Sequence, residues 1–423
     1  MNFKAEELDI LKQKCLSISK TYSYCTILDN NQQKNAFQLQ STEYIFAVGY
    51  KQILNSNCTH AFSDLQNFID SNKSEYILLF LSYDLKNEIE HLHSAHLDPI
   101  GFPDLTAIVP EDFIRVKTNG EISYSSLDFW EKINQTEIEI PIENPSILVQ
   151  AKVNKEDYIH TVKQIRNHII DGDVYELNYC TEFYAKNVEI NPYKTYQELN
   201  KLSPTPFSVF ANLNGLYMMG ASPERFIKKE GQFIYSQPIK GTSKRGENEA
   251  SDEINKQVLL NSEKEKAENL MIVDLVRNDL AKSAKTGTVK VNELYGIYSF
   301  KQVHQMISTV SAELQDDIHI AQIIKNAFPM GSMTGAPKVK AMVLIDQYEQ
   351  TKRGLYSGAI GYIEPNGDFD LNVVIRSLQY NSVKKYLNFE VGSAITFDSI
   401  PEDEYEECLL KAAAMMKVLA GNN

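Results

Sequence analysis

The order of apolar and polar positions divides the chain into segments of strand and helix character. In the first part, residues 43–50 and 75–85 are runs rich in aromatic and aliphatic side chains, which is typical of strands. Around residues 134–147 the sequence becomes polar and contains prolines, as expected at a boundary. We therefore distinguish an N-terminal region, residues 1–140, from a larger region, residues 150–420.

The larger region combines helical and strand patterns. Three stretches have apolar residues at helical spacing between a capping residue and a glycine. Their expected starts and ends are Asn154 and Gly172, Ser262 and Gly287, and Ser399 and Gly421. Short strand-like runs with turn signals, such as 174–186 and 232–241, fill much of the remainder. Runs of strands with helices packed against them predict an α+β fold with antiparallel sheets.

The charge of the chain narrows the range of partners. The 423 residues carry a formal net charge of −14, whereas binding to nucleic-acid phosphates requires clustered Lys and Arg. We therefore expect no nucleic-acid partner. An anionic ligand would need local positive charge from a metal ion, an arginine or backbone N–H groups.

Membrane and secretory signals are not evident in the sequence. No apolar run approaches the roughly 20 residues of a membrane span, and the charged N-terminus does not have the pattern of a signal peptide. The five cysteines are scattered and have no metal-type spacing: Cys15, Cys25, Cys58, Cys180 and Cys408. We expect no membrane association and a location in the reducing cytoplasm.

Two groups of carboxylates have more than one interpretation. Glu268 shares an apolar helical face with Ile272 and Leu275, where it is either a metal ligand or an edge residue paired with a lysine such as Lys264. Glu404, Glu407 and Lys411 fall on one stripe of the last helix. That stripe indicates either an exposed salt bridge or part of a Mg²⁺ site completed by substrate oxygens.

Two further segments are equally ambiguous. Gly392, Ser393 and Ala394 are small enough to let backbone N–H groups approach an anion, or to form a tight turn. Lys240 follows a strand-like run and precedes a turn. A lysine there is either a solvated surface residue or a nucleophile.

Eight blocks together resemble the chorismate-utilising enzymes and occur in that family's order. They are SPERF (222–226), PIKGT (238–242), ENLMIVDLVRND (268–279), VHQMISTV (303–310), GSMTGAPK (331–338), SGAIGY (357–362), IRSL (375–378) and EYEECLLKA (404–412). The resemblance covers roughly residues 150–420, whereas the first 140 residues match only loosely, at LFLSYDLK (79–86). It implies two large antiparallel sheets packed face to face, with helices outside, an active site in the cleft between them, and N-terminal strands in the same body.

The resemblance also implies roles for individual residues. Glu268 and Glu407 correspond to ligands of a Mg²⁺ ion that clamps the ring carboxylate of chorismate, with Glu404 and Lys411 supporting this region. The implied substrate-binding residues are Arg376 and Tyr362 with the backbone of Gly392, Ser393 and Ala394 for the enolpyruvyl carboxylate, and Gly241 and Thr242 for the ring carboxylate. His304 matches the active-site histidine of the family.

Lys240 indicates which reaction the family resemblance implies. Anthranilate-forming relatives have alanine at this position, so the lysine favours the para-aminobenzoate branch. There, a Lys240 amine made neutral by a lowered pKa attacks C2 of chorismate, and the C4 hydroxyl leaves as water. Ammonia then adds at C4 and expels the lysine. Glu224 would protonate the departing hydroxyl, unless it only forms a salt bridge to Arg225 or to a lysine.

Other relatives add water with a lysine base on a strand where this chain has Glu176, which argues against water attack. The sequence contains no Gly-Cys-Gly-type nucleophile, so ammonia would come from a separate glutamine amidotransferase (glutaminase) subunit. The product, 4-amino-4-deoxychorismate, would need a lyase to give para-aminobenzoate for folate synthesis. Two alternatives are an anthranilate-forming component I and a non-catalytic regulatory subunit that binds chorismate.

Overall fold

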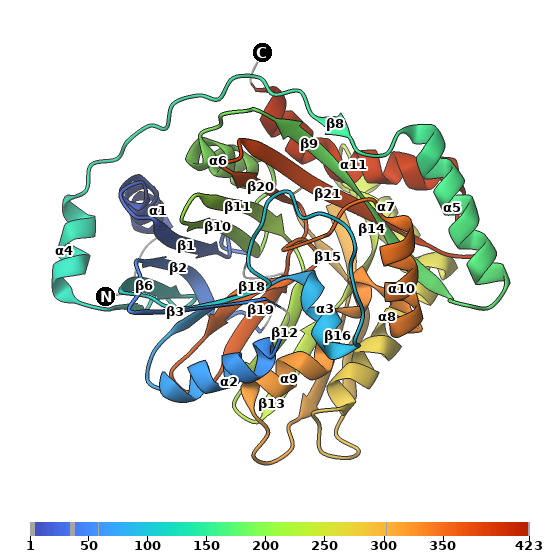
Figure 1. The fold of residues 1–423 in the computed structure, drawn as a ribbon, viewed down its shortest axis with the longest axis horizontal. Helices are drawn as coiled ribbons and strands as arrows, with labels where there is room; N and C mark the ends of the chain where they lie inside the picture. Colours follow the sequence, from blue (N-terminus) through green and yellow to red (C-terminus); the bar gives the residue numbers. More distant parts are fainter. Residues whose placement is uncertain (1–4, 34–38, 58, 302, 422–423) are drawn as a thin grey trace.

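Two large antiparallel sheets form the centre of the computed structural model, which describes residues 5–33, 39–57, 59–301 and 303–421 (Figure 1). In spatial order the first sheet contains β17 (Gly335–Ala336), β9 (Glu176–Lys186), β21 (Tyr386–Ile395), β20 (Ser377–Asn381), β11 (Leu216–Ser222), β10 (Phe207–Leu213), β1 (Tyr24–Asp29), β2 (Thr42–Val48), β6 (Asp112–Lys117) and β7 (Ile122–Tyr124), with β8 (Gln150–Ala151) beside β9. The second contains β14 (Ile239–Lys244), β16 (Val303–Glu313), β13 (Phe233–Gln237), β12 (Arg225–Glu230), β19 (Phe369–Val373), β18 (Ala359–Ile363), β4 (Ile77–Leu81), β5 (Leu105–Val109) and β3 (Gln52–Ser56), with β15 (Lys290–Ser299) beside β16. This arrangement confirms the predicted α+β fold.

The helices cover the outer faces of both sheets (Figure 1). They are α1 (Ala5–Ser19), α2 (Ala61–Ser71), α3 (Lys86–Ile89), α4 (Leu127–Gln135), α5 (Lys155–Ile170), α6 (Pro192–Leu202), α7 (Glu249–Asn261), α8 (Glu263–Ala281), α9 (Ile320–Ala327), α10 (Lys338–Tyr348) and α11 (Pro401–Ala420), with the short 3₁₀ turns η1 (Tyr83–Leu85) and η2 (Gly331–Met333). Within the described residues, no helix combines the length and the apolar character needed to cross a membrane.

The predicted helix starts are correct for α5 and α8. Asn154 accepts a hydrogen bond from the N–H of Asp157, and Ser262 accepts one from the N–H of Glu265. The end of α8 was predicted wrongly at Gly287, because the helix stops at Ala281. The N–H of Lys285 donates to the carbonyl oxygen of Glu313 and so pairs with the sheet rather than continuing the helix.

The last helix begins differently from the prediction. Its N-cap position is Ile400, and Pro401 occupies the first turn. The hydroxyl of Ser399 is used elsewhere, because it accepts from the N–H of Thr396 and donates to the carboxylate of Glu404. Gly421 follows the helix with φ at 75°, as expected for a terminating glycine.

Four of the five cysteines lie in the described part of the chain. They are Cys15, Cys25, Cys180 and Cys408, and each is a buried free thiol. Cys58 lies outside the described residues.

Three apolar clusters hold the layers together. One lies between the first sheet and helices α1, α5, α10 and α11, a second lies between the second sheet and α2, α8 and α9, and a third fills the space between the two sheets. Strand β10 shows the alternation that this requires, since Phe210 packs on the helix side while Val209 and Ala211 join the cluster between the sheets.

Next to strand β9, the space between the two sheets is lined by polar side chains. Leu177, Tyr179 and Phe183 face the outer helices. The residues that alternate with them therefore point toward the other sheet, and they include the buried Glu176, Asn178 and Glu182. Buried polar side chains on an inner face indicate a functional site at this end of the sandwich.

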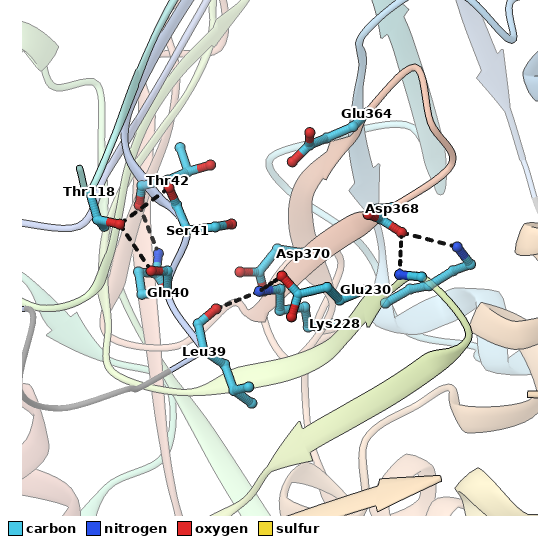
Figure 2. A network of polar contacts seen from close by, with 12 residues as sticks. Leu39, Gln40, Ser41, Thr42, Thr118, Lys228, Glu230, Glu364, Asp368 and Asp370 are labelled. Carbon is cyan, nitrogen blue, oxygen red and sulfur yellow. Dashed lines mark hydrogen bonds and ion pairs between the residues drawn. The ribbon is translucent and has the colours of Figure 1, made fainter. Parts of the chain in front are cut away.

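A polar network joins the segment that leads into β2 to the second sheet (Figure 2). The ammonium of Lys228 donates to the carbonyl oxygen of Leu39, and the hydroxyl of Thr118 donates to that of Gln40 at 3.2 Å. Nearby, Asp368 accepts from the N–H of Gly231 at 2.8 Å. The contact of Lys228 with Leu39 thus joins the N-terminal region to the larger region, and strands of both regions share each sheet.

Candidate active site

Lys240 and Glu176 form an ion pair between the two sheets. Lys240 lies on β14, at a shift in the register with β16 between Ile239 and Thr242. Its ammonium donates to Oε1 of Glu176 at 2.7 Å, and the two side chains are 11% and 0% exposed. The alternative that Lys240 is a solvated surface residue is therefore wrong.

The charge around Lys240 contradicts the expected direction of its pKa. Burial lowers the pKa of this lysine, but the carboxylates of Glu176, Glu268 and Glu407 outweigh that effect and raise the pKa above its usual value. The prediction of a lowered pKa counted desolvation and a nearby Mg²⁺, and it is wrong for the metal-free protein because these three acids outweigh burial. Lys240 therefore carries a proton at neutral pH in the metal-free protein.

Glu224 lies where the chain crosses from the first sheet to the second. It follows β11, which ends at Ser222, and precedes β12, which begins at Arg225. Burial raises the pKa of Glu224 to about 7, against the opposing effects of the Ser332 hydroxyl and the charge on Lys240. Arg225, the partner considered from the sequence, holds Asp370 at 2.8 Å. A carboxyl group that titrates near neutrality is suited to general acid catalysis.

Arg376 supplies positive charge close to Glu224. It occupies the connection between β19 and β20 with φ at 51°, and its carbonyl oxygen accepts from the N–H of Ala221 at 3.0 Å. Burial lowers the pKa of its guanidinium, and the charge of Glu224 acts in the opposite direction. Within the part of the chain that the structure describes, no carboxylate lies at ion-pair distance from this guanidinium, which suits a site for an anionic substrate.

Helix α8 directs two acids toward Lys240. Burial raises the pKa of Glu268 to about 7, and Glu176 and Glu265 act in the same direction against Lys240 and Lys264. Lys264 Nζ lies 3.9 Å from Oε1 of Glu268, so the lysine partner foreseen from the sequence is present at long range. The carboxylate is nevertheless only 15% exposed, and the acids Glu176 and Glu265 add negative charge near it.

Helix α11 brings a second acid to the same region. Glu407 pairs with Lys411 at 2.8 Å, and the two side chains are 48% and 40% exposed. Burial tends to raise the pKa of Glu407, but Lys411, Lys240 and Lys264 hold it below its usual value. The predicted Glu407–Lys411 salt bridge is therefore present, on an acid that also senses Lys240.

His304 is tied to helix α7. Its Nδ1 lies 2.9 Å from the hydroxyl of Ser299, and its Nε2 lies 2.8 Å from the carboxylate of Asp252. Asp252 also accepts two hydrogen bonds from Arg245. The structure does not place the imidazole in contact with Lys240, and its catalytic role stays a prediction.

The chain matches the family described as chorismate binding enzymes over residues 20–417. It belongs to this family.

Individual relatives agree with this assignment. The chain is 32% identical over 360 residues to aminodeoxychorismate synthase component 1 of Bacillus subtilis (strain 168), covering 80% of this chain and 76% of the relative. It is 31% identical over 368 residues to anthranilate synthase component 1 of Acetivibrio thermocellus, covering 80% and 74%. The crystal structure of anthranilate synthase component I from Streptococcus pneumoniae TIGR4 superimposes with a TM-score of 0.78 at 25% identity, covering 90% of this chain and 93% of that one.

The acids of this chorismate-binding enzyme fit a divalent cation shared with a ligand. Among the described residues no three His, Cys, Asp or Glu side chains converge to hold a metal on their own. Mg²⁺ usually takes only one or two protein carboxylates and completes its shell with water and substrate oxygens. Glu268 and Glu407 offer hard oxygen ligands, and a cation would balance the charge of the Glu268 carboxylate, whose pKa is raised to about 7 mainly by burial. Glu404 is 5% exposed and accepts a hydrogen bond from Ser399 at 2.7 Å, so its role as a ligand stays a prediction.

The small residues of β21 lie inside the strand. Gly392, Ser393 and Ala394 pair with Cys180, Tyr179 and Asn178 of β9. The close approach of the strands explains the glycine, because a Cβ there would lie 2.4 Å from Sγ of Cys180. The Ser393 hydroxyl lies 3.0 Å from the hydroxyl of Tyr158, on the helix side. A role for this segment in binding an anion therefore depends on its backbone.

Gly241 and Thr242 directly follow Lys240 in the chain. Gly241 has φ at 90°, and a Cβ on it would lie 3.0 Å from Oε2 of Glu265, so this turn requires glycine. Thr242 is exposed and pairs with Gln305 of β16. Their role in binding the ring carboxylate stays a prediction.

The structure places Tyr362 away from this cluster. Its hydroxyl donates to Oγ1 of Thr42 at 2.7 Å, and Arg115 lies over its ring. Figure 2 shows Thr42 in the polar network near the N-terminal region. Tyr362 therefore lies in that network and not beside Arg376. The family resemblance had suggested that the two residues act together, and the structure does not support this.

Another tyrosine, directly before the SGAIGY block, lies beside β9 and was missed. Tyr356 is buried, and its hydroxyl lies 3.9 Å from Sγ of Cys180, the residue that pairs with Gly392. Burial raises the pKa of Tyr356 well above its usual value, so the phenol stays a hydrogen-bond donor. The only signal in the sequence is the earlier tyrosine of LYSGAIGY, six residues before Tyr362.

Proposed function

We propose that this chain is component I of an aminodeoxychorismate synthase, which converts chorismate and ammonia to 4-amino-4-deoxychorismate. The observation that carries the proposal is the position of Lys240, which is nearly buried and paired with Glu176 at 2.7 Å. By the resemblance of the PIKGT block, this lysine corresponds to the position that distinguishes the para-aminobenzoate branch from anthranilate formation, which supports the proposal. The Bacillus subtilis relative named as aminodeoxychorismate synthase component 1 supports the same choice.

The site residues suit a substrate with two carboxylates. Arg376, which has a free guanidinium among the described residues, binds the enolpyruvyl carboxylate, and the Tyr356 phenol, 3.9 Å from Sγ of Cys180, would donate a hydrogen bond to the substrate beside Gly392. Glu268 and Glu407 would hold a Mg²⁺ ion, which when bound neutralises the ring carboxylate. These local charges allow a protein with a net charge of −14 to bind a dianion.

The chemistry follows from the groups around Lys240. The neutral amine of Lys240 forms a bond to C2 of chorismate, and the two ring double bonds shift by one position as the C4–O bond breaks. Glu224, with its pKa near 7, gives its proton to the departing hydroxyl, which leaves as water. Ammonia then adds at C4, the double bonds shift back, and the C2–N bond breaks to release Lys240.

Two features of the reaction require other proteins. Ammonia would come from a glutamine amidotransferase subunit, and the product would need a lyase to yield para-aminobenzoate for folate. Anthranilate synthase component I is the second candidate, because a relative of that name is 31% identical to this chain. A regulatory chorismate-binding subunit is the third, and any turnover would exclude it.

Product identification tests the proposal directly. The protein is mixed with chorismate, Mg²⁺ and ammonium at mildly alkaline pH, and the products are separated and identified by mass spectrometry. We expect aminodeoxychorismate, which disappears in Lys240→Ala. Anthranilate as the product would refute the proposal, and so would undiminished aminodeoxychorismate formation by Lys240→Ala, since the lysine would then not be the nucleophile.

A further inference from the structure

One oxygen of the buried Glu176 carboxylate has no donor. Oε1 accepts from Lys240 at 2.7 Å, whereas Oε2 is buried and has no hydrogen-bond partner among the described residues. The side chain is 0% exposed. A buried acceptor without a donor is costly, so this oxygen is suited to receive a proton.

The backbone holds Glu176 in a fixed position. It is the first residue of β9 and pairs with Ala336 of β17, while the N–H of Tyr175 donates to the carbonyl oxygen of Ala336 at 2.7 Å. A Cβ at Gly335 would lie only 2.1 Å from the carbonyl oxygen of Glu176, so the two strands approach as closely as glycine permits. The carboxylate therefore meets Lys240 from the start of a strand that is hydrogen-bonded on both sides.

We propose that Glu176 is the catalytic base that accepts the proton from the Lys240 ammonium, keeps it while Lys240 is bound to the substrate, and returns it when the lysine leaves. The inference rests on the proposed function, because it assigns a role within the covalent step of that reaction. From the family resemblance alone, Glu176 only argues against attack by water.

The proton transfers balance over the cycle. The ammonium of Lys240 gives one proton to Glu176, and the resulting amine forms the bond to C2 while Glu224 protonates the hydroxyl that leaves C4. After ammonia has added at C4, the C2–N electron pair returns to Lys240 as a neutral amine, which takes its proton back from Glu176. The added nitrogen gives its extra proton to Glu224. The net change is chorismate plus ammonia to aminodeoxychorismate plus water.

Glu176 is the acid best placed for this transfer. Glu268, Glu407 and Glu224 also act on the charge of Lys240, but none of the three is hydrogen-bonded to it in the described part of the chain. Glu268 lies 3.9 Å from Lys264, and Glu407 pairs with Lys411. Among the described residues, Glu176 is the one carboxylate in hydrogen-bond contact with the Lys240 ammonium.

If Glu176 were only a structural counter-ion, the effect of Glu176→Gln on the rate of attack would be the opposite. If Glu176 only balances the charge of Lys240, Glu176→Gln removes an acid that raises the lysine pKa, and more of the amine is neutral at pH 7. Attack on chorismate should then be as fast as in the wild type or faster. If Glu176 is the proton acceptor, Gln keeps a hydrogen-bond acceptor but cannot take the proton, and attack is slower.

The experiment measures formation of the covalent adduct at Lys240. Wild type and Glu176→Gln are mixed with chorismate and Mg²⁺ without ammonia at pH 7, quenched at intervals, and analysed by intact mass and peptide mapping. The adduct has the mass of chorismate less one water. We expect the rate in Glu176→Gln to fall about 100-fold, the scale of general base catalysis. Asp29→Asn, which changes a buried acid on β1 that pairs with Lys12 at 2.8 Å, should match the wild type.

The outcomes separate this inference from the function on which it rests. An adduct that forms equally fast in wild type and Glu176→Gln overturns the role of Glu176 and leaves the covalent mechanism standing. A wild type that forms product without any adduct overturns the mechanism itself, and the inference with it. If Glu176→Gln does not fold, Glu176→Asp decides, because a shortened carboxylate retracted from Lys240 must slow adduct formation if Glu176 is the base.

Discussion

The ammonium of Lys411 donates a hydrogen bond to the carbonyl oxygen of Gly392 at 2.9 Å and thereby joins α11 to β21. The same ammonium pairs with Glu407 at 2.8 Å. One side chain thus connects a proposed metal ligand with the backbone that lines the proposed carboxylate site. The half-exposed Glu407–Lys411 ion pair contributes less than about 1 kcal/mol to folding stability. We therefore expect Lys411 to matter more for substrate binding than for stability.

Replacing Lys411 should therefore weaken substrate binding and leave folding almost unchanged. We expect Lys411→Met to raise KM for chorismate roughly tenfold, equivalent to about 1.4 kcal/mol of binding. Steady-state kinetics and thermal unfolding measure the two effects. Lys155→Met is a matched control, because Lys155 pairs with Glu406 on the exposed side of the same helix at 2.7 Å. A similar loss of binding in both variants would mean that general surface charge, and not the Gly392 contact, sets KM.

Glu224 should impose a pH limit on the covalent step. Burial raises its pKa to about 7, so the protonated acid is present below this value and is lost as the pH rises. We expect the rate of adduct formation without ammonia to fall above pH 7 by about tenfold for each unit, and Glu224→Gln to lower it by about 10² to 10⁴-fold at pH 7.

Measuring the adduct without ammonia separates this limit from the ionisation of ammonium. Glu230→Gln, at the far end of β12, should keep the wild-type profile, since this side chain is 52% exposed and lies beside Lys228. A profile that is flat between pH 6 and 9 in the wild type would show that Glu224 is not the acid.

The sequence located most of this site but not its internal contacts. The motif blocks predicted one site made of Lys240, Glu224, Glu268, Glu407 and Arg376. In the structure each of these residues is close enough to another of them for its charge to shift that residue's pKa. The Lys240–Glu176 pair was not predictable, because it joins residues 64 positions apart on two sheets. The pKa of Lys240 was wrong for the same reason, since the acids that raise it come from β9, α8 and α11.

Helix starts were predicted correctly where the contacts of the capping residue lie within the first turn. The caps at Asn154 and Ser262 follow from one hydroxyl or amide oxygen and the first turn of a helix. The end of α8 failed because a sheet contact at Lys285 takes over the backbone before Gly287, and the cap at Ser399 failed because Glu404 and Thr396 bind its hydroxyl. Tertiary partners that lie outside a sequence window therefore account for these errors.

Magnesium should stabilise the protein through Glu268. In the metal-free protein the pKa of Glu268 is raised to about 7, so the ionised form is disfavoured in the fold. The corresponding stability is present below the unfolded pKa of about 4.3 and is lost as the pH rises through 7. At pH 8 we expect Mg²⁺ to restore stability, by about 2.7 kcal/mol at a concentration 100 times Kd.

Glu268→Gln separates the metal from other effects. The variant should unfold at a higher temperature than the wild type in EDTA at pH 8, because it removes a disfavoured buried charge, and it should lose most of the Mg²⁺-dependent rise. Calorimetry with and without Mg²⁺ gives both values. A Glu268→Gln variant that keeps the full rise would place the metal elsewhere.

Tyr356 and Tyr362 should have different functions although they lie six residues apart. The Tyr362 hydroxyl donates to Thr42, whose Oγ1 also accepts from Arg115 at 2.8 Å, so Tyr362→Phe removes one buried hydrogen bond and should cost about 1 kcal/mol of stability. It should leave KM for chorismate unchanged. Tyr356→Phe should instead raise that KM roughly tenfold, since its hydroxyl faces the strand position opposite Gly392. Steady-state kinetics and chemical denaturation of the two variants measure these effects side by side. A loss of substrate affinity in Tyr362→Phe with none in Tyr356→Phe would restore the assignment made from the sequence and contradict the geometry of the site.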